Sequence, residues 1–224
     1  MDLGDRMKSY EDVWRQYLPI RMPLIIRVDG RTFHTFTRNL DRPFDLRFAE
    51  AMQLTAAFLV AEIQNAQLAY VQSDEISILL VDFHNFDTEQ WFRGNLQKIV
   101  SLSASLATVG FNSSYGSTQA TFDSRAFILP TAEVNNYFFW RQQDATRNSI
   151  QMVGQANFSH KQLHKQSCTD IQEMLFQKGI NWNDLPTWQR RGAAADAAGI
   201  DLEIPVFSKD HNYVERFLQV EETP

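Results

Sequence analysis

Cysteine is almost absent from this chain. Cys168 is the sole cysteine, so no disulfide can form within the chain. Disulfides are rare in the reducing cytoplasm, and we therefore expect a cytoplasmic protein. No run of about 18 apolar residues occurs, which excludes a membrane-spanning helix. The first residues also lack the charged-then-apolar pattern of a secretory signal.

Basic residues are in the minority. The chain has 21 Lys and Arg against 27 Asp and Glu, a net charge of −6. A protein that coats nucleic acid needs clustered basic residues to neutralise phosphates, and this balance argues against that class. A local basic patch can still bind RNA. The 44% hydrophobic and 21% charged content is ordinary for a globular protein.

Hydrophobic patterning predicts strands and helices in regular alternation. Short continuous apolar runs indicate buried strands, and apolar positions three or four residues apart indicate helices. We expect Asp45 to cap the first long helix, and Asp87 or Thr88 to cap the second. The expected elements are a strand at 24–28, a helix at 47–66, strands at 68–72 and 76–81, a helix at 88–108 and a strand at 124–129 that ends before Pro130.

This order, β-α-β-β-α-β, is the ferredoxin-like split unit of an α+β protein. We expect residues 1–130 to form this domain and residues 131–224 to be a mostly helical extension packed on it, not an independent domain. The expected elements of that extension are helices at 133–147 and 167–176, a basic stretch at 159–165, a mobile segment of low complexity at 193–199 and an edge strand at 204–207.

Two carboxylates stand out at strand ends. Asp29 ends the first strand, and Asp74 lies in the turn between the second and third strands. In the split unit the third strand fills the gap beside the first, which makes these two residues neighbours. Burying carboxylates is costly unless they are paired or bound to metal. The pair is therefore a candidate site for divalent metal ions, which lie about 3.5–4 Å apart in two-metal phosphoryl-transfer sites.

Several longer motifs point to one family. The chain resembles the tRNA-His guanylyltransferase family in motif order and approximate spacing, from about residue 5 to about residue 192. The motifs are Arg27-Val28-Asp29-Gly30-Arg31-Thr32-Phe33-His34-Thr35-Phe36, Gln72-Ser73-Asp74-Glu75-Ile76-Ser77, Lys98-Ile99-Val100-Ser101, Phe122-Asp123-Ser124-Arg125 and Tyr137-Phe138-Phe139-Trp140-Arg141-Gln142-Gln143-Asp144.

The resemblance implies an RNA nucleotidyltransferase with a polymerase-type palm. Enzymes of this family extend RNA in the 3′-to-5′ direction. They activate the tRNA 5′ end, and when that end is a monophosphate they adenylate it with ATP. The 3′-hydroxyl of an incoming nucleotide then attacks the activated phosphate. The resemblance implies tRNA, GTP, ATP and other nucleoside triphosphates as partners, and a homotetramer built as a dimer of dimers.

The resemblance also assigns roles at the site. Asp29 and Asp74 would hold two Mg²⁺ ions, with the backbone carbonyl of Gly30 as a further ligand. Glu75 either binds metal through water or points outward. The remaining nucleotide-binding candidates are Arg31, Thr32, Phe33 and His34 in the triphosphate cradle, with Ser73 and Lys98 beside it.

Basic and amide side chains in the second half are candidate tRNA contacts, because arginine suits phosphate recognition. A scattered basic set is also the ordinary make-up of a solvated face. The candidates are Arg141, Arg147, Asn148, Lys161 and Lys165.

One stretch departs from the family's histidine-tRNA branch. That branch carries His-Ile-Asn-Asn-Leu-Tyr-Asn-Thr, and only Asn148 of residues 146–153 matches it. We therefore expect template-dependent repair of 5′-truncated tRNA. The alternatives are a dedicated tRNA-His guanylyltransferase, a nucleotide cyclase with the same palm, and a non-catalytic RNA-binding relative.

Overall fold

One antiparallel sheet organises the molecule. The computed structural model describes residues 1–85 and 87–220. Six strands pair in the order β4-β1-β3-β2-β5-β6, and all neighbouring strands are antiparallel. The strands are β1 Leu24–Gly30, β2 Ala66–Gln72, β3 Glu75–Leu80, β4 Phe122–Ile128, β5 Ala193–Asp196 and β6 Gly199–Asp201. The first four strands have the order of the split unit, so the expected α+β fold is confirmed.

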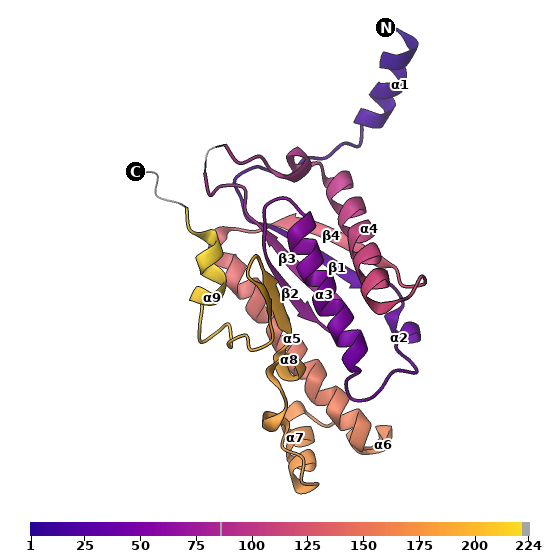
Figure 1. The fold of residues 1–224 in the computed structure, drawn as a ribbon, viewed down its shortest axis with the longest axis vertical. Coiled ribbons are helices and arrows are strands. Elements are labelled where there is room, and N and C mark those ends of the chain that lie inside the picture. Colours follow the sequence, from indigo (N-terminus) through magenta and orange to yellow (C-terminus); the bar gives the residue numbers. More distant parts are fainter. Residues whose placement is uncertain (86, 221–224) are drawn as a thin grey trace.

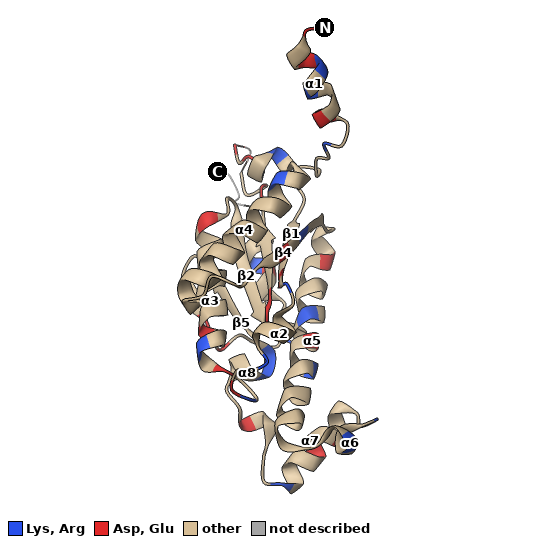
Figure 2. Ribbon diagram, turned by 90° about the vertical axis from the view of Figure 1, so that its right-hand side faces the viewer, with Lys and Arg blue, Asp and Glu red and all other residues tan. Residues whose placement is uncertain are grey.

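Helices cover the two faces of the sheet (Figures 1 and 2). Helices α3 (Leu46–Glu62) and α4 (Leu96–Tyr115) pack on one face over the main hydrophobic cluster. The long helix α5 (Thr131–Asn157) crosses the other face over a second cluster, together with α9 (Asn212–Glu215). Alternate residues of each strand supply the two clusters, as the two-residue side-chain period requires.

A third, smaller cluster lies past the end of the sheet, where α7 (Cys168–Gln177) is drawn in Figure 1. The second half of α5 packs against α7 and the 3₁₀ turn Trp182–Asp184 there. The remaining short helices are α2 Phe33–Phe36, α6 His160–Leu163, α8 Thr187–Arg191 and two 3₁₀ turns, Trp91–Gly94 and Arg216–Leu218.

Helix α1 (Leu3–Asp12) projects away from the body (Figure 1). None of its residues is buried. Large apolar side chains on and just after it are exposed, including Tyr10 at 68% and Trp14 at 75%. None of the helices in the described part of the chain has the length and apolarity that crossing a membrane requires.

Helix boundaries follow local capping. The expected cap Asp45 is confirmed, since its carboxylate accepts a hydrogen bond from the Phe48 N–H at 2.8 Å. The expected start of α4 near residue 88 is wrong. Asn95 caps that helix by accepting from the Lys98 N–H at 3.1 Å, and the preceding residues Phe92 and Arg93 have positive φ angles that interrupt any helix.

Two further expectations in the second half are wrong. Residues 193–196 form a regular strand, β5, whose three alanines are buried and pair with β2, so the expected irregular segment is absent there. A small side chain fits where sheet and helices pack closely, which low complexity does not reveal. Residues 204–207 form no strand, although Ile204 and Phe207 are buried in the second cluster.

Candidate active site

The ends of three strands meet at one corner of the sheet. Asp29 near the end of β1 pairs in register with Glu75 at the start of β3 and with Asp123 on β4. The Gly30 N–H donates to the Asp74 carbonyl oxygen at 3.0 Å, which fixes the β2–β3 turn against the end of β1. The expected proximity of Asp29 and Asp74 is therefore present.

Burial and neighbouring carboxylates raise the pKa values of Asp29 and Asp74. Burial, followed by the charge of Asp29, raises the pKa of Asp74 to about 6. Burial, followed by the charges of Glu75 and Asp123, raises the pKa of Asp29. Nearby negative charges that share a half-buried corner favour a bound cation.

Oxygen donors at this corner suit Mg²⁺, which protein sites commonly hold with one or two carboxylates and substrate phosphates. Asp29 and Asp74 supply carboxylate oxygens, and their raised pKa values mark incomplete charge compensation. Within residues 1–85 and 87–220, no group of three or more His, Cys, Asp or Glu side chains is placed to hold a metal ion.

Glu75 takes a position that neither sequence alternative anticipated. Its carboxylate is buried and accepts hydrogen bonds from Arg141 Nε at 2.8 Å and Nη2 at 2.9 Å. Arg27 lies 3.8 Å away, and Gln72 donates to the same carboxylate at 3.3 Å. Glu75 therefore points to helix α5, not to solvent.

Arg141 is correspondingly unavailable at the surface. Only 6% of it is exposed, and its second partner is Asp144 at 2.9 Å. Asp144 in turn pairs with the exposed Arg147. The expectation of a direct tRNA contact by Arg141 is not supported, because the side chain is buried and its Nε and Nη2 atoms already donate to Glu75 and to the partly exposed Asp144.

The segment after Gly30 forms a tight turn into α2. A Cβ on Gly30 would lie 2.3 Å from the Phe33 ring, so only glycine allows this approach. The N–H groups of Gly30 and Arg31 already donate, to the carbonyls of Asp74 and Thr121. The N–H groups of residues 32–34, at the start of the short helix, remain as hydrogen-bond donors for a bound anion.

Lys98 is far from this turn within one chain. It lies in the first turn of α4, whereas Tyr115 at the other end of α4 contacts the ring of Phe36 in α2. Lys98 and Tyr115 are 17 positions apart on the same helix, a rise of about 25 Å. The expectation that Lys98 stands beside the triphosphate cradle is not met within the chain.

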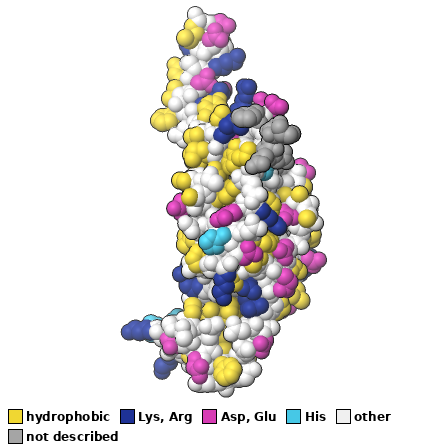
Figure 3. Space-filling view, turned by 90° about the vertical axis from the view of Figure 1, so that its left-hand side faces the viewer, with side chains coloured by type: hydrophobic (Ala, Val, Ile, Leu, Met, Phe, Trp, Pro, Cys, Tyr) yellow, Lys and Arg dark blue, Asp and Glu magenta, His cyan; other side chains and the backbone are white. Residues whose placement is uncertain are grey.

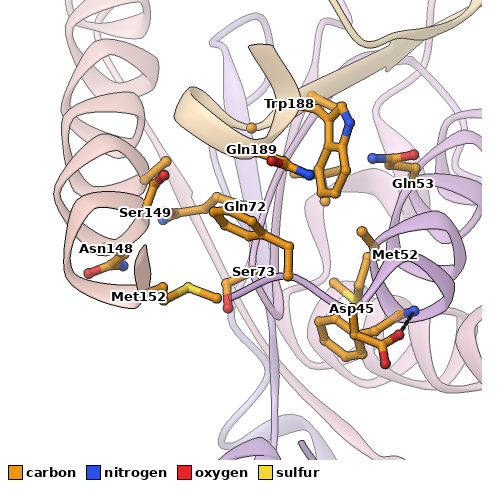
Figure 4. Close-up of a pocket in the computed structure, with 17 residues that line it drawn as sticks. Asp45, Met52, Gln53, Gln72, Ser73, Asn148, Ser149, Met152, Trp188 and Gln189 are labelled. Atoms are coloured by element: carbon orange, nitrogen blue, oxygen red, sulfur yellow. Dashed lines mark hydrogen bonds between the residues drawn. The ribbon is translucent and has the colours of Figure 1, made fainter. Parts of the chain in front are cut away.

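Pockets adjoin Ser73 in the turn before Asp74. One lies between α3, α5, α8 and the β2–β3 turn (Figure 4). Asn148 and Met152 line it from α5, and Trp188 lines it from α8. A second pocket shares Asp45, Phe48, Ser73 and Met152 with the first and extends to Leu40 and Pro43. The first pocket is a mainly apolar recess beside the turn that carries Asp74, and the second extends it with a more polar lining that includes Asp41 and Arg42.

The other candidates for tRNA contact are spread along the second half. Arg147 lies on the outer face of α5, and Lys161 and Lys165 lie exposed on and after α6. His34 is exposed beside the turn at Gly30. Helix α6, which carries Lys161, follows the end of α5 that extends past the sheet (Figure 1).

Asp123 is a site residue that the sequence interpretation left without a role. It lies beside Asp29 and pairs with Arg125 at 3.4 Å. The strand order supplies the missing signal: β4 flanks β1 on the side away from β3, so the first residues of β4 meet the last residues of β1.

Known proteins match this chain along most of its length. The family model for tRNAHis guanylyltransferase matches residues 4–130. The tRNA(His) guanylyltransferase of Schizosaccharomyces pombe is 31% identical over 218 residues, covering 88% of this chain and 81% of that protein.

Two solved structures are also similar. A bacterial tRNA(His) guanylyltransferase (Thg1)-like protein in complex with ATP has a TM-score of 0.95 and 50% identity over 98% of this chain and all of that chain. A bacterial protein of the same description in complex with GTP has a TM-score of 0.88 and 47% identity, covering 97% of this chain and 99% of that chain.

Proposed function

The chain belongs to the tRNA-His guanylyltransferase family of nucleotidyltransferases, and we propose that it extends the 5′ end of tRNA in the 3′-to-5′ direction with Mg²⁺. The observation that carries the proposal is the convergence of Asp29 and Asp74 at adjoining strand ends, where both pKa values are raised. Mg²⁺ would lower the pKa of the attacking hydroxyl and neutralise charge on the phosphates.

Each part of the corner has a proposed role. Asp29, Asp74 and the Gly30 carbonyl would hold the metal ions, and the N–H groups at the start of α2 would bind the triphosphate. The apolar recess beside Ser73 would receive the base, since it lies next to the turn that carries Asp74. ATP and GTP are the proposed nucleotides, because similar proteins bind them.

Glu75 has a positioning role in this proposal. Its carboxylate is bound on both oxygens by Arg141 and adds negative charge beside Asp29. It would keep the β2–β3 turn and the metal-binding Asp74 in place rather than touch the substrate.

We infer that the substrates are 5′-truncated tRNAs and that base pairing with the opposite strand selects each nucleotide. Only Asn148 of residues 146–153 matches the histidine-tRNA element. Selecting one tRNA by its anticodon requires contacts to base edges, because phosphate contacts carry no sequence information. A dedicated tRNA-His guanylyltransferase is the second candidate, favoured by the activity of the yeast relative.

A nucleotide-addition assay tests the proposal. Wild-type protein with Mg²⁺ and nucleoside triphosphates should lengthen 5′-truncated tRNAs of several specificities. A strong preference for full-length tRNA-His that disappears when its anticodon changes would restore the second candidate. Formation of a cyclic nucleotide without RNA extension would establish the cyclase alternative.

Variants test the assignment of the carboxylates. Asp29→Ala and Asp74→Ala should each lower the addition rate by at least about 100-fold, since metal-assisted stabilisation of phosphoryl transfer amounts to several kcal/mol. Asp210→Ala is the matched control, because Asp210 is exposed outside the strand ends. Near-normal activity of folded Asp29→Ala or Asp74→Ala protein in Mg²⁺ would refute the metal site.

A further inference from the structure

A separate pocket, with basic residues in a partly apolar lining, is bordered by α5 and lies apart from the recess at Ser73. It is lined by side chains from α5, α7, the turn at 182–184 and α8, and by Val206. Arg147, Arg190 and Arg191 all line it, and none of its lining residues is acidic. Three arginines therefore border one opening whose lining holds no carboxylate, although Asp144 pairs with Arg147 and the charge of Glu203 acts on Arg191 from outside the lining.

Two of these arginines have no ion pair in the described part of the chain. Arg147 pairs with Asp144, whereas no salt bridge joins Arg190 or Arg191 to a carboxylate. The Nε atoms of Arg190 and Arg191 are buried without a hydrogen-bond partner. Burial, together with the charge of Arg190, lowers the pKa of Arg191. Buried guanidinium nitrogens without partners are costly, and an anion would compensate them.

The rest of the lining suits a nucleic-acid backbone. Trp182 presents an aromatic ring whose Nε1 is held by the Ser149 hydroxyl at 3.0 Å. Gln143 and Asn183 are exposed at the opening and can donate to phosphate oxygens. Basic side chains also gather on the lower half of the face drawn in Figure 3. On a protein with a net charge of −6, such a local patch is the kind of surface that binds RNA.

We propose that this arginine pocket, formed by Arg147, Arg190 and Arg191, binds a backbone phosphate of the RNA substrate. The inference rests on the proposed tRNA substrate and adds a contact separate from the carboxylates. Arginine binds phosphate through two parallel N–H groups, and such contacts position RNA without reading its sequence. The pocket therefore serves any tRNA.

The test compares RNA affinity and its salt dependence. Arg190→Gln/Arg191→Gln should weaken binding of a fluorescent 5′-truncated tRNA about tenfold at low salt. It should also reduce the slope of log affinity against log salt by about 1 for each lost phosphate contact. Binding of GTP with Mg²⁺ should not change. Lys8→Gln/Arg93→Gln removes two exposed charges near the opposite end of the molecule, and should leave both affinities unchanged.

Circular dichroism would reveal a folding defect in the glutamine variant. Arg190→Lys/Arg191→Lys is a second variant that tests the pocket if the glutamine variant does not fold. The lysine variant keeps the charge and loses the paired N–H groups. It should retain most of the salt slope but bind RNA more weakly than wild type. If both folded variants keep the RNA affinity and the salt dependence of the wild type, the assignment of this pocket to RNA is wrong.

The remaining outcomes separate the pocket from the proposed function. Weaker GTP binding with normal RNA binding would assign the pocket to a free triphosphate and overturn the RNA assignment. If the wild-type protein extends tRNA while the variants bind it normally, the RNA assignment of the pocket is wrong and the proposed function stands. If the wild-type protein neither binds nor extends tRNA, the proposed function fails and the pocket fails with it.

Discussion

Asp74 shows how a single side chain links stability to the proposed chemistry. Its pKa is raised to about 6, so the folded protein holds this proton more tightly than the unfolded chain does. The favourable contribution to folding is complete below the ordinary pKa of 3.8 and is lost as pH rises through about 6. Without metal, the ionised carboxylate therefore destabilises the fold at neutral pH.

We predict that Asp74→Asn raises the melting temperature of the metal-free protein at neutral pH while it abolishes nucleotide addition. The gain should shrink as pH falls below about 6, because the wild-type carboxyl then becomes neutral too. Thermal melts in EDTA across this pH range measure it. Asp210→Asn should show no such pH dependence, and a melting temperature lowered equally at every pH would contradict the prediction.

The Glu75–Arg141 pair gives a second prediction at this scale. Arg141→Met should lower the free energy of unfolding by about 3–5 kcal/mol, because it leaves the Glu75 carboxylate buried without its main partner. Glu75→Gln/Arg141→Met should recover part of this loss. Urea unfolding of the single and double variants measures the coupling. A loss below about 1 kcal/mol in Arg141→Met would mean that water replaces the guanidinium.

Single residues also mark the limit of the sequence interpretation. Asp29 and Asp74 could be placed together because strand order alone determines their proximity. The pairing of Glu75 with Arg141 could not, because it depends on where α5 crosses the sheet. Nothing in the local pattern around residue 141 separates a buried arginine from an exposed one, since long charged side chains occur in both settings.

At the scale of elements, alternation and capping predicted most of the fold. The strands and the first long helix were placed nearly where they occur, because their apolar periods are strong. The start of α4 was misplaced, because the apolar residues before it form a 3₁₀ turn with left-handed residues. The fifth strand was missed, because alanine has low strand propensity and only packing against β2 makes it a strand.

The turn from α8 into β5 yields the third prediction. Gly192 has a φ of +85°, and a Cβ there would lie 2.4 Å from the Val71 carbonyl oxygen. Gly192→Ala should therefore lower the free energy of unfolding by about 1–3 kcal/mol through strain and displaced strand pairing. Urea unfolding measures the loss. Gly179→Ala is the matched control, because its φ is also positive but no atom lies within 4 Å of its Cβ.

At the scale of the whole molecule, α1 is the helix that projects from the body (Figure 1). It buries nothing within the chain, yet it carries exposed apolar side chains such as Leu3 and Tyr10. Several large apolar side chains exposed close together on one helix are typical of a surface that associates with another protein. We propose that α1 contributes to the expected tetramer.

Deletion of residues 1–14 should therefore reduce the assembly to a smaller species in analytical ultracentrifugation. The deletion should leave the unfolding of the body unchanged, since α1 has no buried residue. Met7→Ser/Tyr10→Ser keeps the helix and removes apolar surface, and should weaken assembly in the same direction. An unchanged mass for both proteins would show that α1 has no part in assembly.

Helix α5 has one more consequence. Its first half packs into the second cluster beneath the sheet, and its second half packs into the third cluster with α7. A single continuous helix of 27 residues thus packs against both the sheet and α7. We therefore predict that residues 131–224 do not fold as a separate unit. Amide hydrogens in the middle of α5, around residues 138–149, should exchange with deuterium only when the whole protein unfolds.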